Sequence, residues 1–183
     1  MVLAALERGL DGLVFTDHDR LIPPQRVEEL RRKYAPFAVY SGIEVTVSAE
    51  HVLVLGLGDS CLEAGHWSYP DLHAFVRASG GYLVLAHPYR FRDTIEIDIG
   101  AYPPDAIELR SKNIRLTDEH RIRALAESVG AQLVCNSDAH RAEDVGSFYN
   151  LVQTNSRGPE NLVELLRTRG LFCTGSPLTS PGS

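Results

Sequence analysis

Apolar residues follow two different periods along the chain, one typical of strands and one typical of helices. Short apolar runs predict strands, and several of these runs are apolar on both faces, as buried parallel strands are. Between the runs, apolar residues recur at helical spacing, which predicts amphipathic helices. The strands are predicted at residues 12–15, 37–47, 51–57, 82–88, 106–110, 132–140 and 148–154.

The predicted helices carry signals at their ends. Pro24 lies near the first turn of one, and in another Thr117 is the expected N-cap and Gly130 the terminator. Apolar residues also fall at helical spacing from the first residues, so the chain opens inside an amphipathic helix; these are Val2, Leu3, Leu6 and Leu10. The other helices are predicted at 23–34, 69–81, 116–130 and 158–170, the last with Leu162, Val163, Leu165 and Leu166 inward.

Strands that alternate with helices predict βαβ units and an α/β fold with a mainly parallel sheet. The pattern leaves a barrel and an open doubly wound sheet as alternatives. The chain has no GxGxxG after its first strand and no GxxxxGK[ST], so the signatures of dinucleotide and P-loop binding are absent. We expect one domain over residues 1–175, followed by a disordered Ser/Pro/Gly tail over 176–183.

The composition is that of an ordinary globular domain: 183 residues, 44% hydrophobic and 23% charged, with a net charge of -6. The acidic balance disfavours a non-specific nucleic-acid binder. Three cysteines without CxxC spacing (Cys61, Cys135 and Cys173) predict no disulfide framework and a reducing cytoplasm, with Cys135 in the core. Neither a membrane-spanning run nor a basic signal-peptide start is present, so we expect a cytoplasmic protein that does not contact membranes.

Side chains that can bind metals follow most of the predicted strands. In α/β folds the carboxyl ends of the strands converge at one edge, where active sites lie. Any one such residue can instead be a turn former or a helix cap. Taken together they favour a site, because unrelated caps would include more Ser, Asn and Gly. The set comprises Asp17, His18, Asp19, Glu44, His87, Asp138 and His140.

His51 begins its predicted strand, yet a hairpin with the preceding strand would bring it to the same edge. Too few residues separate it from the strand that ends at Val47 for a crossover helix, so the two strands should pair antiparallel. The start of the second strand then lies beside the end of the first, close to Glu44. A histidine that merely packs in the hairpin turn is the alternative.

Imidazole and carboxylate ligands without thiolates suit Zn, Mn or Fe(II). Two such ions, roughly 3.5–4 Å apart, would deprotonate a water between them and stabilise an in-line displacement at phosphorus. This chemistry is phosphoester hydrolysis. Arg90 and Arg92 would add guanidinium donors for phosphate oxygens. For Arg92 a solvated loop cation is an equal alternative.

In this order, the motifs TDHD (16–19), GIE (42–44), His51, AHPYR (86–90) and SDAH (137–140) resemble the polymerase and histidinol phosphatase (PHP) family. TDH or AHP alone would be weak, but the ordered set is specific. The resemblance implies a distorted (β/α)7 barrel that binds two to three divalent metals. It also implies hydrolysis of a small phosphate monoester, nucleotide-like or histidinol-phosphate-like.

By this resemblance, Glu44 and Asp138 would bind the first metal, Glu44, His51 and His87 the second, and His18 and His140 the third. Asp17 would orient a ligand or bind directly. Catalysis would then rest on Asp138, Glu44 and Asp17, and substrate binding on Arg90 and Arg92.

The family's opening strand, which ends in His-x-His and completes the first metal site, does not precede the helix at Met1. We expect that strand upstream of Met1, lost through a misassigned start or an expression boundary, and an in-frame His-x-His codon run there would test this. For the printed chain we expect weakened first-site binding and low activity. A non-catalytic PHP-like scaffold or binding module with a degraded metal site is the alternative.

Overall fold

The structure is a computed structural model that describes residues 1–153, 161–167 and 171–174. The predicted tail over 176–183 lies outside these residues, as do Gly158, Pro159 and Gly170, the expected ends of the last helix. None of the described helices is both long enough and apolar enough to cross a membrane.

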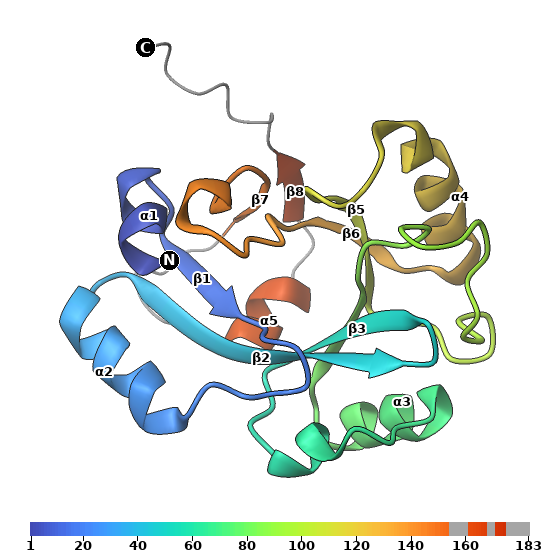
Figure 1. The fold of residues 1–183 in the computed structure, drawn as a ribbon, viewed down its shortest axis with the longest axis horizontal. Helices are drawn as coiled ribbons and strands as arrows, with labels where there is room; N and C mark the ends of the chain where they lie inside the picture. The colour runs from blue at the N-terminus through green and yellow to red at the C-terminus, as the bar shows by residue number, and fades with distance from the viewer. Residues whose placement is uncertain (154–160, 168–170, 175–183) are drawn as a thin grey trace.

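A sheet curled into a half-barrel forms the centre of the fold (Figure 1). Its strands lie in chain order, and all pair parallel except β3, which is antiparallel to both its neighbours. The mixed α/β class and the predicted hairpin are therefore confirmed. The strands are β1 (Gly12–Phe15), β2 (Ala38–Val47), β3 (Glu50–Leu55), β4 (Tyr82–Leu85), β5 (Ala106–Arg110) and β6 (Gln132–Cys135).

The helices begin and end largely where the sequence signals predict. Ser68 caps α3 by accepting a hydrogen bond from the Asp71 N–H, and Gly130 ends α4 in the left-handed conformation. The N-cap prediction for Thr117 is wrong. Thr117 lies in a 3-10 turn (η2, Leu116–Asp118), and α4 starts at Glu119 with Asp118 as its N-cap. The helices are α1 (Val2–Glu7), α2 (Pro24–Tyr34), α3 (Tyr69–Ala78), α4 (Glu119–Val129) and α5 (Leu162–Arg167), with further 3-10 turns η1 (Ser60–Ala64) and η3 (Ala142–Asp144).

The outer face of the sheet packs against four helices. Helices α3 and α4 contribute Leu72, Val76 and Ile122 to the larger cluster, and α1 and α2 cover β1 and β2. In α1 the inward residues are Val2 and Ala5. The predicted opening helix is therefore present, but its Leu3 and Leu6 side chains are 59% and 39% exposed. The short helix turns its smaller side chains to the sheet.

The inner face of the sheet is divided into an apolar half and a polar half. Val163 and Leu166 of α5 pack there against residues from β3 to β6, among them Leu53, Leu55, Tyr82 and Val84. Because side chains alternate along a strand, Glu44 and Glu108 point to this same inner side, opposite Ile43 and Ile107 of the outer core. The inner face is therefore apolar at one end and acidic at the other.

Strand β7 (Tyr149–Val152) does not join the main sheet. It pairs antiparallel with β8 (Leu171–Thr174), a strand that the sequence patterns did not predict. A disulfide links Cys135 at the end of β6 to Cys173 of β8, with their Cα atoms 5.2 Å apart. The expectation that the cysteines form no disulfide is therefore wrong, whereas the burial of Cys135 is confirmed.

Candidate metal centre

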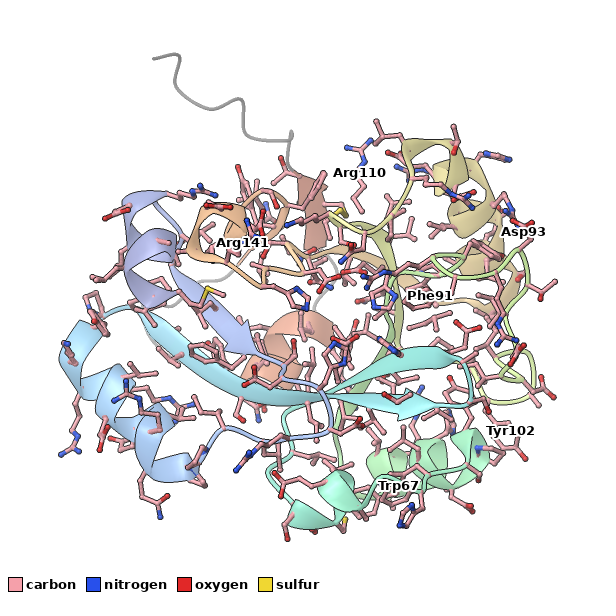
Figure 2. All side chains as sticks on the ribbon, in the orientation of Figure 1. Trp67, Phe91, Asp93, Tyr102, Arg110 and Arg141 are labelled. Atoms are coloured by element: carbon pink, nitrogen blue, oxygen red, sulfur yellow. A yellow bond between two sulfur atoms is a disulfide. The ribbon has the colours of Figure 1, made fainter. Side chains whose placement is uncertain are left out.

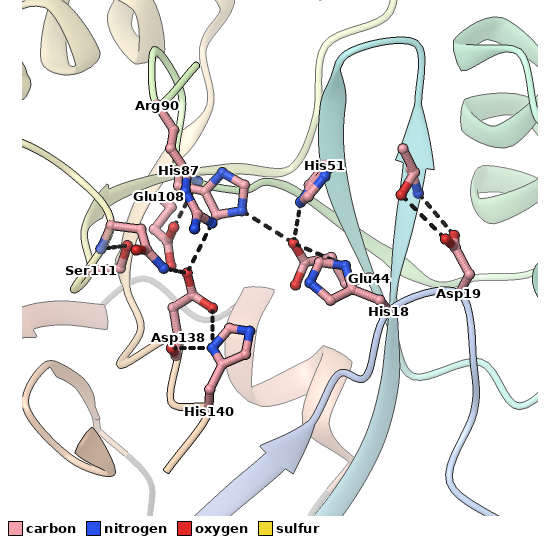
Figure 3. Close-up of polar contacts among 12 residues, drawn as sticks. His18, Asp19, Glu44, His51, His87, Arg90, Glu108, Ser111, Asp138 and His140 are labelled. Atoms are coloured by element: carbon pink, nitrogen blue, oxygen red, sulfur yellow. Dashed lines mark hydrogen bonds and ion pairs between the residues drawn. The ribbon is translucent and has the colours of Figure 1, made fainter. Parts of the chain in front are cut away.

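The polar residues predicted from the strand ends meet at one edge of the half-barrel (Figure 3). His18 follows β1, Glu44 lies on β2, and His51 lies near the start of β3. The site is completed by His87 after β4, Glu108 on β5, and Asp138 and His140 after β6.

Glu44 is the centre of this cluster. Its Oε1 atom accepts hydrogen bonds from His51 Nδ1 at 2.6 Å and His87 Nε2 at 3.1 Å. His18 Nδ1 lies 3.9 Å from the same oxygen. The backbone explains this convergence, because the Glu44 N–H donates to Asp17 and the Asp19 N–H donates to Glu44. These two bonds extend the pairing of β1 and β2 beyond the end of β1 and carry His18 to Glu44.

The charges of this cluster support one another. Burial alone would raise the pKa of Glu44, but the hydrogen bonds from His51 and His87 and the charge of His18 outweigh it and hold the pKa at about 2. Burial would likewise lower the pKa of His87, yet the Glu44 and Glu108 carboxylates raise it above its ordinary value. Glu44 is therefore an ionised carboxylate at neutral pH.

Asp138 is the centre of a second group. Its carboxylate lies 3.7 Å from His140 Nδ1 and 3.8 Å from a terminal guanidinium nitrogen of Arg90. Asn113 donates a hydrogen bond to it, which the sequence analysis did not predict. The His18 and His140 rings, with centroids 6.2 Å apart, connect the two groups.

Three predicted residues take other positions. The Asp17 carboxylate has no hydrogen bond or ion pair with any residue that the structure describes, so its catalytic role stays a prediction. Asp19 instead accepts hydrogen bonds from the backbone and the hydroxyl of Thr46. Arg92 pairs with Glu96, although it lines the same hollow as His51.

Glu108 is the buried acid of the site that sequence reasoning missed. Its carboxylate accepts a hydrogen bond of 2.7 Å from the His87 N–H, and burial raises its pKa to about 7 against the opposing charge of His87. The signal was present in the apolar run AIELR, where a lone acid lies between residues of a buried strand. Its role depends on a neighbouring strand, which the run does not specify.

A loop after β4 forms the rim of the site. Phe91 is 61% exposed, and its ring packs edge-on against the His51 and His87 rings. The Arg90 guanidinium lies 4.8 Å from the centre of the same ring. The loop is fastened to α4 through Asp93, whose carboxylate lies 3.6 Å from the guanidinium of Arg121 in that helix. Figure 2 labels Asp93 close to α4. The rim therefore places one cation and one aromatic ring directly over the histidines.

The donor atoms present suit a divalent metal. One ligand atom each from His18, Glu44 and His51 lies within 4.8 Å of the others. All the donors are imidazole nitrogens and carboxylate oxygens, the set that binds Zn, Mn and Fe(II). An ionised carboxylate that already faces three imidazoles needs only small side-chain movements to share an ion with them. The residues therefore fit a metal centre.

Comparisons with known proteins agree with this fold. Residues 118–170 match the PHP-associated family, a segment that includes α4, β6, Asp138 and His140. PsfC from Pseudomonas syringae PB-5123 is similar in structure over 96% of this chain and 81% of its own, with 22% identity and a TM-score of 0.75. No curated protein matches the chain in sequence.

Two further solved structures share the fold. An amidohydrolase from Chromobacterium violaceum, with bound sulfate, is 19% identical over 79% of this chain and 83% of its own, with a TM-score of 0.62. A candidate metal-dependent phosphoesterase from Bifidobacterium adolescentis is 14% identical over 90% of this chain and 88% of its own, with a TM-score of 0.63. The family match therefore assigns residues 118–170 to the PHP-associated family, and the solved structures show that the chain shares their fold.

Proposed function

We propose that this protein is a metal-dependent hydrolase that cleaves small phosphate monoesters, nucleotide-like or histidinol-phosphate-like. The observation that carries the proposal is the Glu44 carboxylate, which faces three imidazoles beside Asp138, His140 and Arg90. The name of one structural neighbour, a candidate metal-dependent phosphoesterase, agrees with metal-dependent hydrolysis. The sulfate bound to another, an amidohydrolase whose structure contains no metal, agrees with an anionic ligand. We also propose that the half-barrel belongs to a distorted (β/α)7 barrel.

Two to three divalent ions, Zn, Mn or Fe, would be held by the residues of the two groups. In this proposal Glu44, His51 and His87 hold one ion, Glu44 and Asp138 a second, and His18 and His140 a third. When bound, the ions supply Lewis acidity and a water of lowered pKa. Asp17 supports Glu44 from its backbone, since its carbonyl accepts the Glu44 N–H.

The arginines of the rim bind the substrate in this proposal. Arg90 has its guanidinium 3.8 Å from Asp138, so a phosphate beside the ligand cluster lies within its reach. A guanidinium is planar and matches two phosphate oxygens at once. Arg92 must first leave Glu96 to contribute, which makes its role the weaker of the two.

The test combines metal analysis with an assay of phosphate release. Purified protein is loaded with Mn, Zn or Fe(II) and tested on nucleoside monophosphates, histidinol phosphate and sugar phosphates. Glu44→Gln should lower both metal content and phosphate release, the latter by at least about 100-fold. Glu28→Gln is the matched control, because Glu28 is an exposed acid of α2 outside the site.

Two outcomes would count against the proposal. Metal binding without phosphate release from any compound would favour a non-catalytic binding or scaffold module. Phosphate release that is equal in Glu44→Gln and Glu28→Gln would show that the activity does not come from this site.

A further inference from the structure

Glu108 lies on β5, next to the strand β4 that leads to the candidate ligand His87. It is 2% exposed on the inner face of β5. Its Oε2 atom accepts the His87 N–H at 2.7 Å (Figure 3). Such a fully buried acid is costly unless its hydrogen-bonding capacity is used. The one bond that Glu108 accepts from the described backbone therefore indicates a role in holding His87.

The backbone at His87 has a conformation that a bulky side chain rarely adopts. Its φ angle is 25°, in the left-handed region that favours glycine. The preceding Ala86 N–H still donates to His51 as a continuation of the pairing between β3 and β4. The next N–H, that of His87, faces the other neighbour, β5, where it donates to the Glu108 side chain in place of a backbone carbonyl. The chain therefore leaves the sheet at His87, and Glu108 accepts the bond that the ladder no longer provides.

This turn sets the direction of the His87 imidazole. From the left-handed position its Nε2 atom lies 3.1 Å from Glu44 Oε1, on the inner side of the sheet. Residues held in unfavourable backbone conformations persist only where their surroundings enforce them. The Glu108 carboxylate is the described side chain that bonds the His87 backbone.

We propose that Glu108 is a positioning residue, which holds the His87 backbone in its left-handed turn and so aims the imidazole at the metal centre. The inference rests on the proposed function for the presence of a metal, whereas the hydrogen bond that holds the His87 backbone does not depend on a metal. Among the described residues, the Glu108 carboxylate bonds the His87 backbone and has no hydrogen bond or ion pair with Glu44 or Asp138.

The test uses three substitutions with graded ability to accept the bond. Glu108→Gln retains an acceptor at the same distance along the side chain, Glu108→Asp withdraws it by one methylene, and Glu108→Ala removes it. The first readout is the His87 amide signal in protein labelled with ¹⁵N-histidine, assigned by its loss in His87→Gln. The second is Co²⁺ affinity, measured from visible absorption against a competing chelator.

We expect Glu108→Gln to keep the His87 amide signal and to bind Co²⁺ like the unmodified protein. Glu108→Asp and Glu108→Ala should shift that signal and weaken Co²⁺ binding by roughly 10- to 100-fold, the usual effect of losing a group that orients a ligand. Asp105→Ala is the matched control. Asp105 accepts the Leu83 N–H at the opposite end of β4, so its loss should lower stability but leave both readouts unchanged.

The outcomes separate this inference from the proposed function. An unchanged His87 amide signal and unchanged Co²⁺ affinity in folded Glu108→Ala would overturn it, as would a Glu108→Gln protein as impaired as Glu108→Ala. If Glu108→Ala does not fold, the comparison of the Asp and Gln variants decides. If the unmodified protein binds no Co²⁺, the proposed function fails while the amide signal still tests Glu108.

Discussion

Reduction of the disulfide between Cys135 and Cys173 should destabilise the protein strongly. The bond joins β6, the strand that leads to Asp138, to β8 of the second sheet. The two cysteines are 38 residues apart in sequence. In the chain-entropy description, closing a loop of this length lowers the conformational entropy of the unfolded chain, which stabilises the folded protein by about 4 kcal/mol. Since single domains are stable by about 5–15 kcal/mol, the loss is a large fraction of the whole.

The assay is urea denaturation followed by circular dichroism, with and without a non-thiol phosphine reductant. We expect the reductant to lower the unfolding free energy by about 4 kcal/mol. Cys173→Ser should behave like the reduced protein and no longer respond to the reductant. Cys61→Ser is the control, because Cys61 is a free thiol and its variant should respond like the unmodified protein.

A thiol count decides whether the reasoning holds. Under denaturing conditions without reductant, the chain should expose the single thiol of Cys61 out of its three cysteines. Three reactive thiols, together with a urea midpoint that the reductant does not move, would refute the bond and the stabilisation drawn from it.

Three further substitutions test the rim, the inner core and the start of α4. Arg90→Ala should lower kcat/KM for phosphate release at least about 10-fold with metal content unchanged, because a charged donor to phosphate is lost, and Arg90→Lys should recover part of it. Leu166→Ala should lower the unfolding free energy by about 2–3 kcal/mol in urea titrations, because Leu166 of α5 packs on the inner face. The hydrogen bond that Arg115 donates to Asp118, together with the charge of Arg121, holds the pKa of Asp118 below its ordinary 3.8. The stabilisation from this carboxylate is therefore present above pH 3.8 and is lost as pH falls through the lowered pKa. Asp118→Asn should therefore melt at a lower temperature at neutral pH, with the difference vanishing in strong acid.

Local patterns predicted most of the main sheet because its strands are short buried runs with clear ends. The segments 12–15 and 106–110 became β1 and β5 with the same bounds, and the hairpin followed from the short gap before His51. The second sheet was not predictable in this way. Strand β8 is not a buried run, since its residues are half-buried or exposed, and its partner β7 lies across a helix in sequence, so no local period relates the two. The disulfide was missed for the same reason, since pairing across 38 residues depends on that sheet.

The residues of the candidate site also fall into those that the sequence could predict and those that it could not. Glu44, His51 and His87 were predictable because strand ends meet at a sheet edge whatever the details of packing. Glu108 and Asn113 were not, because each contributes through one bond to a residue on another element. Such partners depend on the register between β4 and β5 and on the paths of the loops after β5 and β6.

The division of the inner face explains why those partners are polar. Leu166 and Val163 of α5 fill one end of the half-barrel, which removes water from that end and leaves the other end as the place for polar groups. The acids there are buried by the same curvature that brings the strands together, so each must be bonded to a histidine or a backbone N–H. Glu44 meets this requirement through imidazoles and Glu108 through the His87 backbone. Packing at one end of the sheet and ligand geometry at the other are therefore consequences of one curled surface, and a change that flattens it should weaken both.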